Sequence, residues 1–145
     1  MQTKKQAFEL ISDIMTLNQK QWNNPRFSFD PNASAALRIE EALETIGVTD
    51  AKEAARGIVD EASKIFTPPA EVDQLDSILD DIYICVGEAH KLGLTPHQLV
   101  DALQAVHNAN KLKAGDKDSE GKVTKPKDFV GPETKLQTIL DQRSR

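Results

Sequence analysis

The sequence predicts an all-α protein built from four to five helices. Apolar residues recur every three or four positions through several long segments, which is the spacing of one face of a helix. Proline and glycine separate these segments, at Pro25, Gly47, Pro68 and Gly93. No segment alternates convincingly between apolar and polar residues with the period of two that indicates a strand. A single helical domain spanning residues 1–145 is therefore expected.

The composition is that of an ordinary globular protein. The chain has 145 residues, of which 39% are hydrophobic and 28% charged, and its net charge is -5. An acidic surface does not attract nucleic acid or anionic lipid, so neither is expected as a partner. The only cysteine, Cys85, leaves no disulfide framework and indicates a reducing compartment. No segment is as long and apolar as a signal peptide core or a transmembrane helix, so we expect a soluble, cytoplasmic protein.

The first three helices are expected before residue 66. The first spans about residues 4–22, where a broad apolar face is followed by asparagines and a proline. The second begins with Ser34 as its N-cap and ends at Gly47. The third spans residues 50–65 and begins with a capping box. The box consists of Asp50 and Glu53.

The fourth helix, over about residues 70–92, is the most apolar. Its expected buried stripe consists of Leu75, Ile78, Leu79, Ile82, Val86 and Ala89. The fifth runs from Thr95, with an N-cap, a proline at the first helical position and Gln98 completing a capping box, to about Asn110. A last short helix begins near Pro132.

Carboxylates gather on the second and fourth helices. Three glutamates lie within just over one turn of the second helix, and three aspartates share one face of the fourth. Six carboxylates on two adjacent helices would repel one another unless a cation lay between them, and Mg²⁺ prefers oxygen ligands. The sequence therefore favours a magnesium site, and the alternative is a solvated acidic face. The residues are Glu40, Glu41, Glu44, Asp73, Asp76 and Asp80.

Lysines gather after the fifth helix, in what we expect to be an exposed loop over residues 113–131. Beside a bound metal these lysines would close over a phosphate chain, whereas without one they would form an ordinary charged loop. Asn108 and Asn110 could donate hydrogen bonds to a base or a sugar. The lysines are Lys111, Lys113, Lys122, Lys125 and Lys127.

These residues together resemble the signature of the MazG-like all-α nucleoside triphosphate pyrophosphohydrolases, a superfamily that includes phosphoribosyl-ATP pyrophosphohydrolase. The first motif is Glu40-Glu41-x-x-Glu44, followed on a later helix by an acidic residue-x-x-Asp. The second is Asp76-x-x-x-Asp80-x-x-Tyr83-x-x-x-Gly87. The third, His107-x-x-Asn110-x-x-Lys113 with Gly121-Lys122-Val123-x-Lys125-Pro126-x-x-Phe129, is similar to the tail of a branch that acts on deoxynucleotides. The family usually has glutamate where Asp73 stands.

The resemblance implies an oligomeric MazG-like bundle, a dimer or tetramer, that hydrolyses the α–β bond of a nucleoside triphosphate, with dUTP or dCTP favoured. A nucleotide-pool, house-cleaning role follows. It implies that Glu41, Glu44, Asp73 and Asp76 bind Mg²⁺, or Mn²⁺ in its place. Asp80 would support these ligands, or Asp76 and Asp80 would be the metal-binding pair instead of Asp73 and Asp76. Glu40 or Glu41 would act as the base. The residues that would contact substrate are Tyr83, Asn110, Lys113, Lys122 and Lys125.

Two other functions stay open at this stage. One is phosphoribosyl-ATP hydrolysis, which the same superfamily performs. The other is a non-catalytic helical interaction protein whose carboxylates form a solvated face. Metal-dependent turnover would separate the enzymes from the interaction protein, since fold alone does not determine function.

Overall fold

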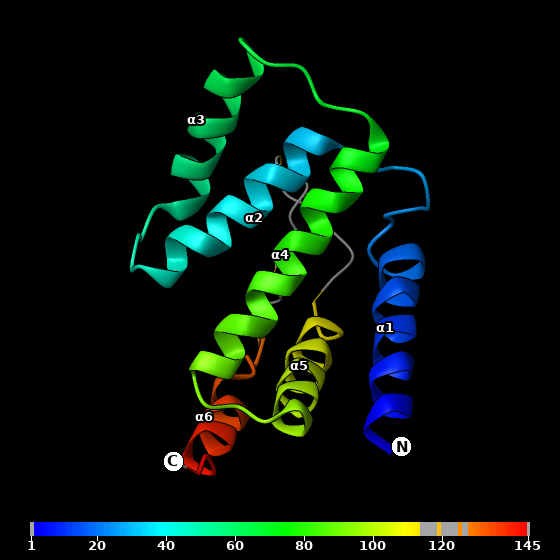
Figure 1. Cartoon of the computed structure of the whole chain (residues 1–145), viewed down its shortest axis with the longest axis vertical. Coiled ribbons are helices and arrows are strands. Elements are labelled where there is room, and N and C mark those ends of the chain that lie inside the picture. The colour runs from blue at the N-terminus through cyan, green and yellow to red at the C-terminus, as the bar shows by residue number, and fades with distance from the viewer. Residues whose placement is uncertain (1, 114–118, 120–124, 126–127, 145) are drawn as a thin grey trace.

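The chain folds into helices alone. The computed structural model describes residues 2–113, 119, 125 and 128–144, and no strand occurs among them. The described helices are six (Figure 1): α1 (Gln2–Lys20), α2 (Pro31–Thr45), α3 (Ala51–Ser63), α4 (Glu71–Lys91), α5 (Pro96–Asn110) and α6 (Glu133–Asp141). The all-α prediction is confirmed, with six helices in the described residues where the sequence predicted four to five.

Of the three N-terminal caps that the sequence predicted, one is confirmed and two are not. Thr95 caps α5 as predicted, and Gln98 completes the capping box. The expected N-cap at Ser34 is wrong, because the cap lies four residues earlier, at Asp30, whose side chain accepts hydrogen bonds from the first turn. Pro31 then occupies the first helical position, where its missing N–H leaves no hydrogen bond unmade. Asp50 stands at the start of α3 without a side-chain cap bond, so the expected capping box there is absent.

Close packing joins the helices in two groups. The first is the hairpin of α2 and α3, and the second contains α5 with α1 on one side and α6 on the other. Gly47 turns the chain between α2 and α3 with a φ of 89°, a conformation that favours glycine. The buried apolar side chains among the described residues belong to these two groups. They are Leu10, Leu17, Ala51, Ala55, Ala105 and Ala109.

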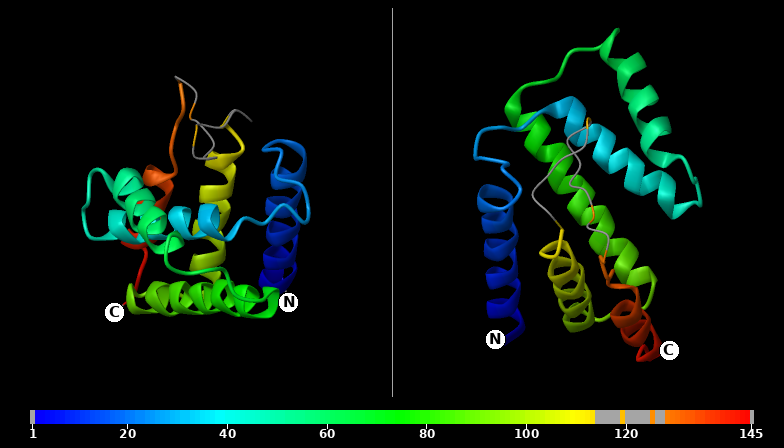
Figure 2. Two further views of the ribbon diagram at one scale, coloured as in Figure 1. Left: turned by 90° about the horizontal axis from the view of Figure 1, so that it is seen from above. Right: turned by 180° about the vertical axis from the view of Figure 1, so that it is seen from behind.

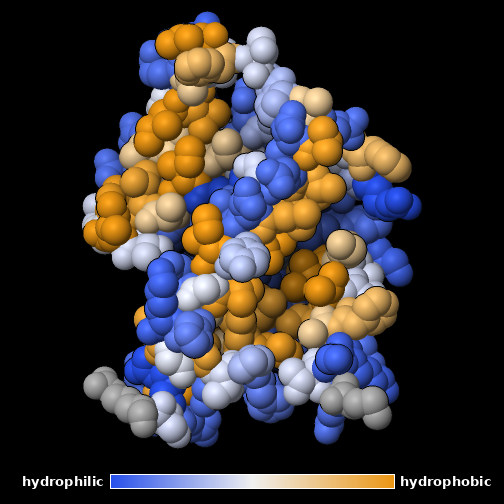
Figure 3. Space-filling view, in the orientation of Figure 1, coloured by the Kyte–Doolittle hydropathy of each residue, from blue (hydrophilic) through white to orange (hydrophobic). Residues whose placement is uncertain are grey.

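Helix α4 lies outside both groups. Figure 2 shows α4 along one edge of the molecule, and all the other helices lie on one side of it. The predicted buried stripe of α4 is wrong for the single chain, since no residue of this helix is buried. The apolar side chains are present, but the described residues leave most of the large ones exposed, and Figure 3 shows hydrophobic surface along α4 on the front face, interrupted by hydrophilic side chains. Neither α4 nor any other described helix has the length and apolar content needed to cross a membrane.

Candidate functional site

A cavity of about 770 Å³ lies where the end of α1, the middle of α2 and the second half of α4 meet. Its volume is within the range of ligand pockets. Apolar and charged side chains contribute equally in number to its lining, and three uncharged polar residues complete it. The lining residues are Asn18, Trp22, Asn24, Leu37, Arg38, Glu41, Ala42, Thr45, Asp81, Ile84, Cys85, Glu88 and Lys113.

Helical spacing explains which side chains reach this cavity. Arg38, Glu41 and Thr45 follow one another on α2 at offsets of three and four, so they share one face. Asp81 and Glu88 lie two turns apart on the same face of α4. The Arg38 guanidinium pairs with the Asp81 carboxylate across the gap between the two helices. This ion pair therefore links α2 to α4 at the wall of the cavity.

Lys113 reaches the cavity from the end of α5. The side-chain amide of Gln21 donates hydrogen bonds to the backbone carbonyls of Lys111, at 2.9 Å, and Lys113, at 3.0 Å. These bonds tie the end of α1 to the end of α5. The ammonium groups of Lys113 and Lys125 both lie over the ring of Phe129, at 5.7 and 5.4 Å from its centroid. Two of the predicted phosphate-binding lysines are thus close to one another, while Lys122 lies outside the described residues.

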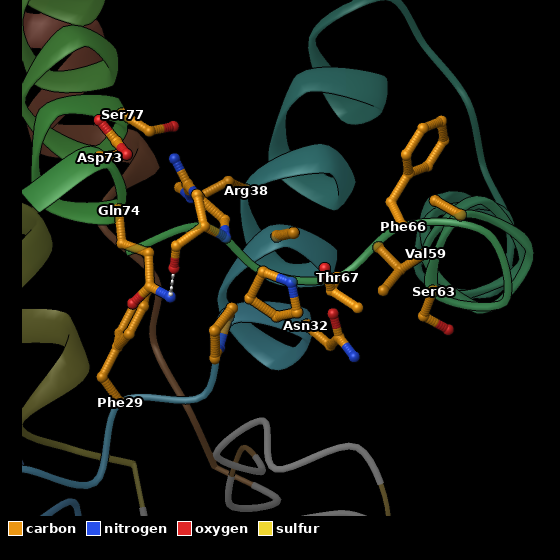
Figure 4. A pocket seen from close by; sticks show the side chains of 15 residues that line it. Phe29, Asn32, Arg38, Val59, Ser63, Phe66, Thr67, Asp73, Gln74 and Ser77 are labelled. Atoms are coloured by element: carbon orange, nitrogen blue, oxygen red, sulfur yellow. Dashed lines mark hydrogen bonds between the residues drawn. The ribbon is translucent and has the colours of Figure 1, made fainter. Parts of the chain in front are cut away.

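A second, smaller cavity of about 250 Å³ adjoins the start of α4 (Figure 4). Asp73 and Ser77 of α4 lie on one side of it, with Arg38 of α2 next to them. Gln74 is held by a hydrogen bond of 2.9 Å from its side-chain amide to the carbonyl of Pro69. Arg38 lines both cavities, the smaller one together with Asp73 and the larger one together with Glu41.

Of the six predicted carboxylates, each of the two cavities has one in its lining. Glu41 lines the larger cavity and Asp73 the smaller one. Glu40 is buried, at 6% exposure, and it belongs to neither cavity lining. The other three carboxylates are exposed outside both cavities, and they are Glu44, Asp76 and Asp80. Among the described residues there is no group of three or more metal-binding side chains close enough to hold an ion.

The two remaining substrate candidates lie apart from the larger cavity. Tyr83 is exposed on α4 and projects on a different side of the helix from Asp81, from which it is two residues away. Asn110, the last residue of α5, is partly buried and does not line the cavity. Of the predicted substrate residues that are described, Lys113 alone belongs to the cavity lining.

Sequence reasoning missed three charged residues of the cavity: Arg38, Asp81 and Glu88. Arg38 directly precedes the glutamate motif and shares a face with Glu41, so helical spacing was a signal for it. Asp81 gave no such signal, because its role depends on where α4 lies relative to α2. The sequence does not specify that arrangement through any local pattern.

The pKa of His107 is shifted from its ordinary value. His107 is buried on α5, and burial lowers this pKa below the ordinary value of 6.5. The positive charge of Lys111 lowers the pKa further, whereas the Asp13 carboxylate opposes the shift. His107 does not line the larger cavity.

No protein-family model matches the chain, and no curated protein and no solved structure is similar enough to match it. The resemblance to the MazG-like enzymes therefore stays a prediction from the motifs. The function has to be argued from the cavity itself.

Proposed function

We propose that the chain is a Mg²⁺-dependent nucleoside triphosphate pyrophosphohydrolase. It cleaves the bond between the α and β phosphates of a deoxynucleoside triphosphate, with dUTP or dCTP favoured, and acts as a cytoplasmic homo-oligomer. The observation that carries the proposal is the larger cavity, in which a carboxylate, Glu41, lines the wall together with two cations, Arg38 and Lys113. A triphosphate requires such positive groups, and hydrolysis requires a carboxylate near the water that attacks.

The charged and the apolar residues of the cavity bind different parts of the substrate. Arg38 and Lys113 bind the phosphate oxygens, and the planar guanidinium of Arg38 suits bidentate contact. The apolar part of the lining, including Leu37 and Ile84, accommodates the base or the sugar. Water adds to the phosphorus, the bond to the bridging oxygen breaks, and the products are a monophosphate and pyrophosphate. Glu41 takes the proton that the water loses.

The residues present fit one kind of magnesium binding. No group of three metal-binding side chains occurs among the described residues. We therefore do not propose a Mg²⁺ whose ligands all come from the protein. Mg²⁺ is commonly bound by one or two carboxylates, substrate phosphates and water. Glu41 and Glu88, both in the cavity lining, would hold a Mg²⁺ that arrives with the triphosphate. The ion would neutralise phosphate charge and lower the pKa of a bound water.

The first test is a hydrolysis assay on the purified chain. The panel contains the deoxynucleoside triphosphates, dUTP included, with their ribose counterparts and phosphoribosyl-ATP, each with Mg²⁺ and then with a chelator. Pyrophosphate and orthophosphate are scored separately. We expect metal-dependent pyrophosphate release from dUTP or dCTP. Orthophosphate release would mean that a different bond is cut, and metal-independent release would remove Mg²⁺ from the mechanism.

Substitutions then connect the activity with the cavity. Glu41→Gln should lower kcat by about 100-fold or more, since it removes a general base. Glu9→Gln is the matched control, because Glu9 is exposed on α1 and lines neither of the two cavities. Equal activity of Glu41→Gln and the wild type would refute the assignment. Glu44→Gln tests whether the predicted carboxylates gather when substrate binds, in which case its activity falls as well.

A non-catalytic interaction protein is the second candidate, and the exposed apolar side chains of α4 favour it. Under this alternative, no nucleotide in the panel is hydrolysed. Glu41→Gln then leaves the fold intact and raises thermal stability slightly, because it removes negative charge from an acidic helix. Mg²⁺ stabilises the protein only if the cavity binds it, so a melting experiment with and without the ion separates the two candidates.

A further inference from the structure

The smaller cavity, of about 250 Å³, combines an apolar wall with one acidic and one basic side chain. It lies between the first half of α2, the second half of α3, the start of α4 and the segment that joins α3 to α4. Among the described residues that line it, Asp73 is the only carboxylate and Arg38 the only cation. The apolar wall comes mainly from α3 and the joining segment (Figure 4). It includes Val59, Phe66, Pro68 and Pro69.

Both charged side chains have bonding capacity left over. The Asp73 side chain has no hydrogen-bond or ion-pair partner among the described residues. Arg38 uses Nη1 to pair with the Asp81 carboxylate, while its Nε is buried and has no acceptor in the described structure. A buried N–H without an acceptor is destabilising, and the Nε–Nη2 edge of a guanidinium matches the two oxygens of a carboxylate.

The two charges together select the kind of ligand. A divalent metal ion bound by Asp73 would be repelled by the adjacent Arg38, and a phosphate bound by Arg38 would be repelled by Asp73. A ligand that carries an ammonium and a carboxylate close together satisfies both side chains. An α-amino acid has this form at neutral pH, because its amino group is protonated and its carboxyl group is ionised.

We propose that the smaller cavity binds a free α-amino acid with an apolar side chain. The ligand ammonium pairs with Asp73, its carboxylate accepts hydrogen bonds from the Nε–Nη2 edge of Arg38, and its side chain packs against the apolar wall. The volume lies below the roughly 300 Å³ at which pockets for drug-sized ligands begin, so the ligand is smaller than a nucleotide. Binding requires neither nucleotide nor metal, so the inference does not rest on the proposed function.

Local features hold the walls of the cavity in place before a ligand binds. Pro68 and Pro69 fix φ at two positions of the joining segment. The side-chain amide of Gln74 donates a hydrogen bond of 2.9 Å to the carbonyl of Pro69, which ties this segment to α4. On the other side, α2 and α3 pack closely as a hairpin. A site that is already formed loses less conformational entropy when its ligand binds.

The first experiment is a ¹H–¹⁵N NMR titration of the full chain with L-leucine at neutral pH. We expect saturable shifts of the backbone amide signals of Thr67 and of residues 73–77, with a Kd of about 1 mM or tighter. N-acetyl-leucine lacks the ammonium and leucinamide lacks the carboxylate, while both keep the leucine side chain. Each analogue should bind about 10-fold more weakly or worse, because one charge-assisted contact is lost.

Three outcomes of the titration would overturn the proposal. The first is equal affinity for leucine and both analogues, because the apolar wall alone would then account for binding. The second is the absence of saturable shifts with leucine, isoleucine, valine, methionine and phenylalanine. The third is stronger binding at Asp73 by uridine, MgCl₂ or inorganic phosphate, which would assign the cavity to a neutral base, a cation or an anion. Nucleotide hydrolysis without amino-acid binding refutes this proposal alone, and amino-acid binding without hydrolysis refutes the proposed function alone.

Asp73→Asn tests the ammonium contact directly. This variant should weaken leucine binding by about 10-fold or more and leave the affinity for N-acetyl-leucine unchanged, since that analogue has no ammonium to pair. Asp76→Asn is the matched control, because Asp76 is exposed on the same helix and lines neither cavity. It should bind leucine like the wild type, and an equal loss in both variants would contradict the assigned contact. Far-UV circular dichroism should show unchanged helix content in both variants, which separates lost binding from lost folding.

Discussion

Leu10 is the residue on which the packing of α1 depends most. It is 2% exposed and is the largest side chain that is fully buried in the described structure. Helix α1 packs closely against α5, where Ala105 and Ala109 are buried. Leu10→Ala would remove three side-chain carbons from this contact and leave a cavity, because the small alanines of α5 cannot move far enough to fill it.

The expected cost is about 3 kcal/mol of unfolding free energy, within the range for fully buried leucines. For a chain of this length each kcal/mol lowers the Tm by about 2–4 °C, so Leu10→Ala should lower it by about 6–12 °C. Ile11→Ala is the matched control, since Ile11 is the next residue on the same helix but is 54% exposed. It should cost about 1 kcal/mol or less, partly offset by the higher helix propensity of alanine.

Both variants are measured by urea unfolding, followed by far-UV circular dichroism at one fixed protein concentration because association affects stability. Leu10→Ala should lower the urea midpoint without a large change in slope, and Ile11→Ala should leave it nearly unchanged. Equal losses in the two variants would refute the reasoning, because they would mean that the exposed face of α1 is as well covered as the buried one.

Three further outcomes follow from single contacts. Burial lowers the pKa of His107 below 6.5, so the unfolded chain binds a proton first and the free energy of unfolding should fall as the pH drops below this value. Urea midpoints above and below pH 6.5 measure this loss, and the His107→Gln variant should show a smaller one. Thr95→Ala should cost about 1 kcal/mol, because it removes the N-cap of α5, whereas Asp50→Ala should cost far less since Asp50 makes no cap bond; thermal melts compare the two. Asp81→Asn should cost less than about 1 kcal/mol, since its pairing with Arg38 is partly exposed, and the difference from wild type should shrink in high salt.

Local patterns predicted the helices well, and their failures have local causes. The capping box at Thr95 is confirmed because its two partners lie within the same turn, so no distant contact can displace them. At the start of α2 the sequence Asp30-Pro31 fits a cap followed by a first-turn proline, whereas the expected N-cap was Ser34. Asp50 has the right residue type for a cap and makes no cap bond, because residue type alone does not fix the backbone angles that such a bond needs.

The candidate site was less predictable than the helices. Glu40 and Glu41 are adjacent in sequence, yet a helix turns by about 100° between them. One is consequently buried outside the cavity lining and the other lines the cavity. The ion pair between Arg38 and Asp81 joins residues 43 positions apart, so it depends on how α4 lies across α2. Sequence spacing assigns side chains to faces of one helix, and it does not determine which faces of two helices meet.

The two longest helices, α1 and α4, both expose apolar rows, but they differ in how well the described residues cover them. Helix α1 exposes Phe8, Ile11 and Met15, but it also buries Leu10 and Leu17 on another face, so its packing against α5 is already satisfied within the chain. Helix α4 has the higher mean hydropathy of the two and buries nothing. An isolated helix of about 20 residues is only marginally stable in water, so most of its stability has to come from an apolar face that is covered. Among the described residues α4 is therefore less completely packed than α1, although the apolar side chains of their exposed rows are similarly exposed.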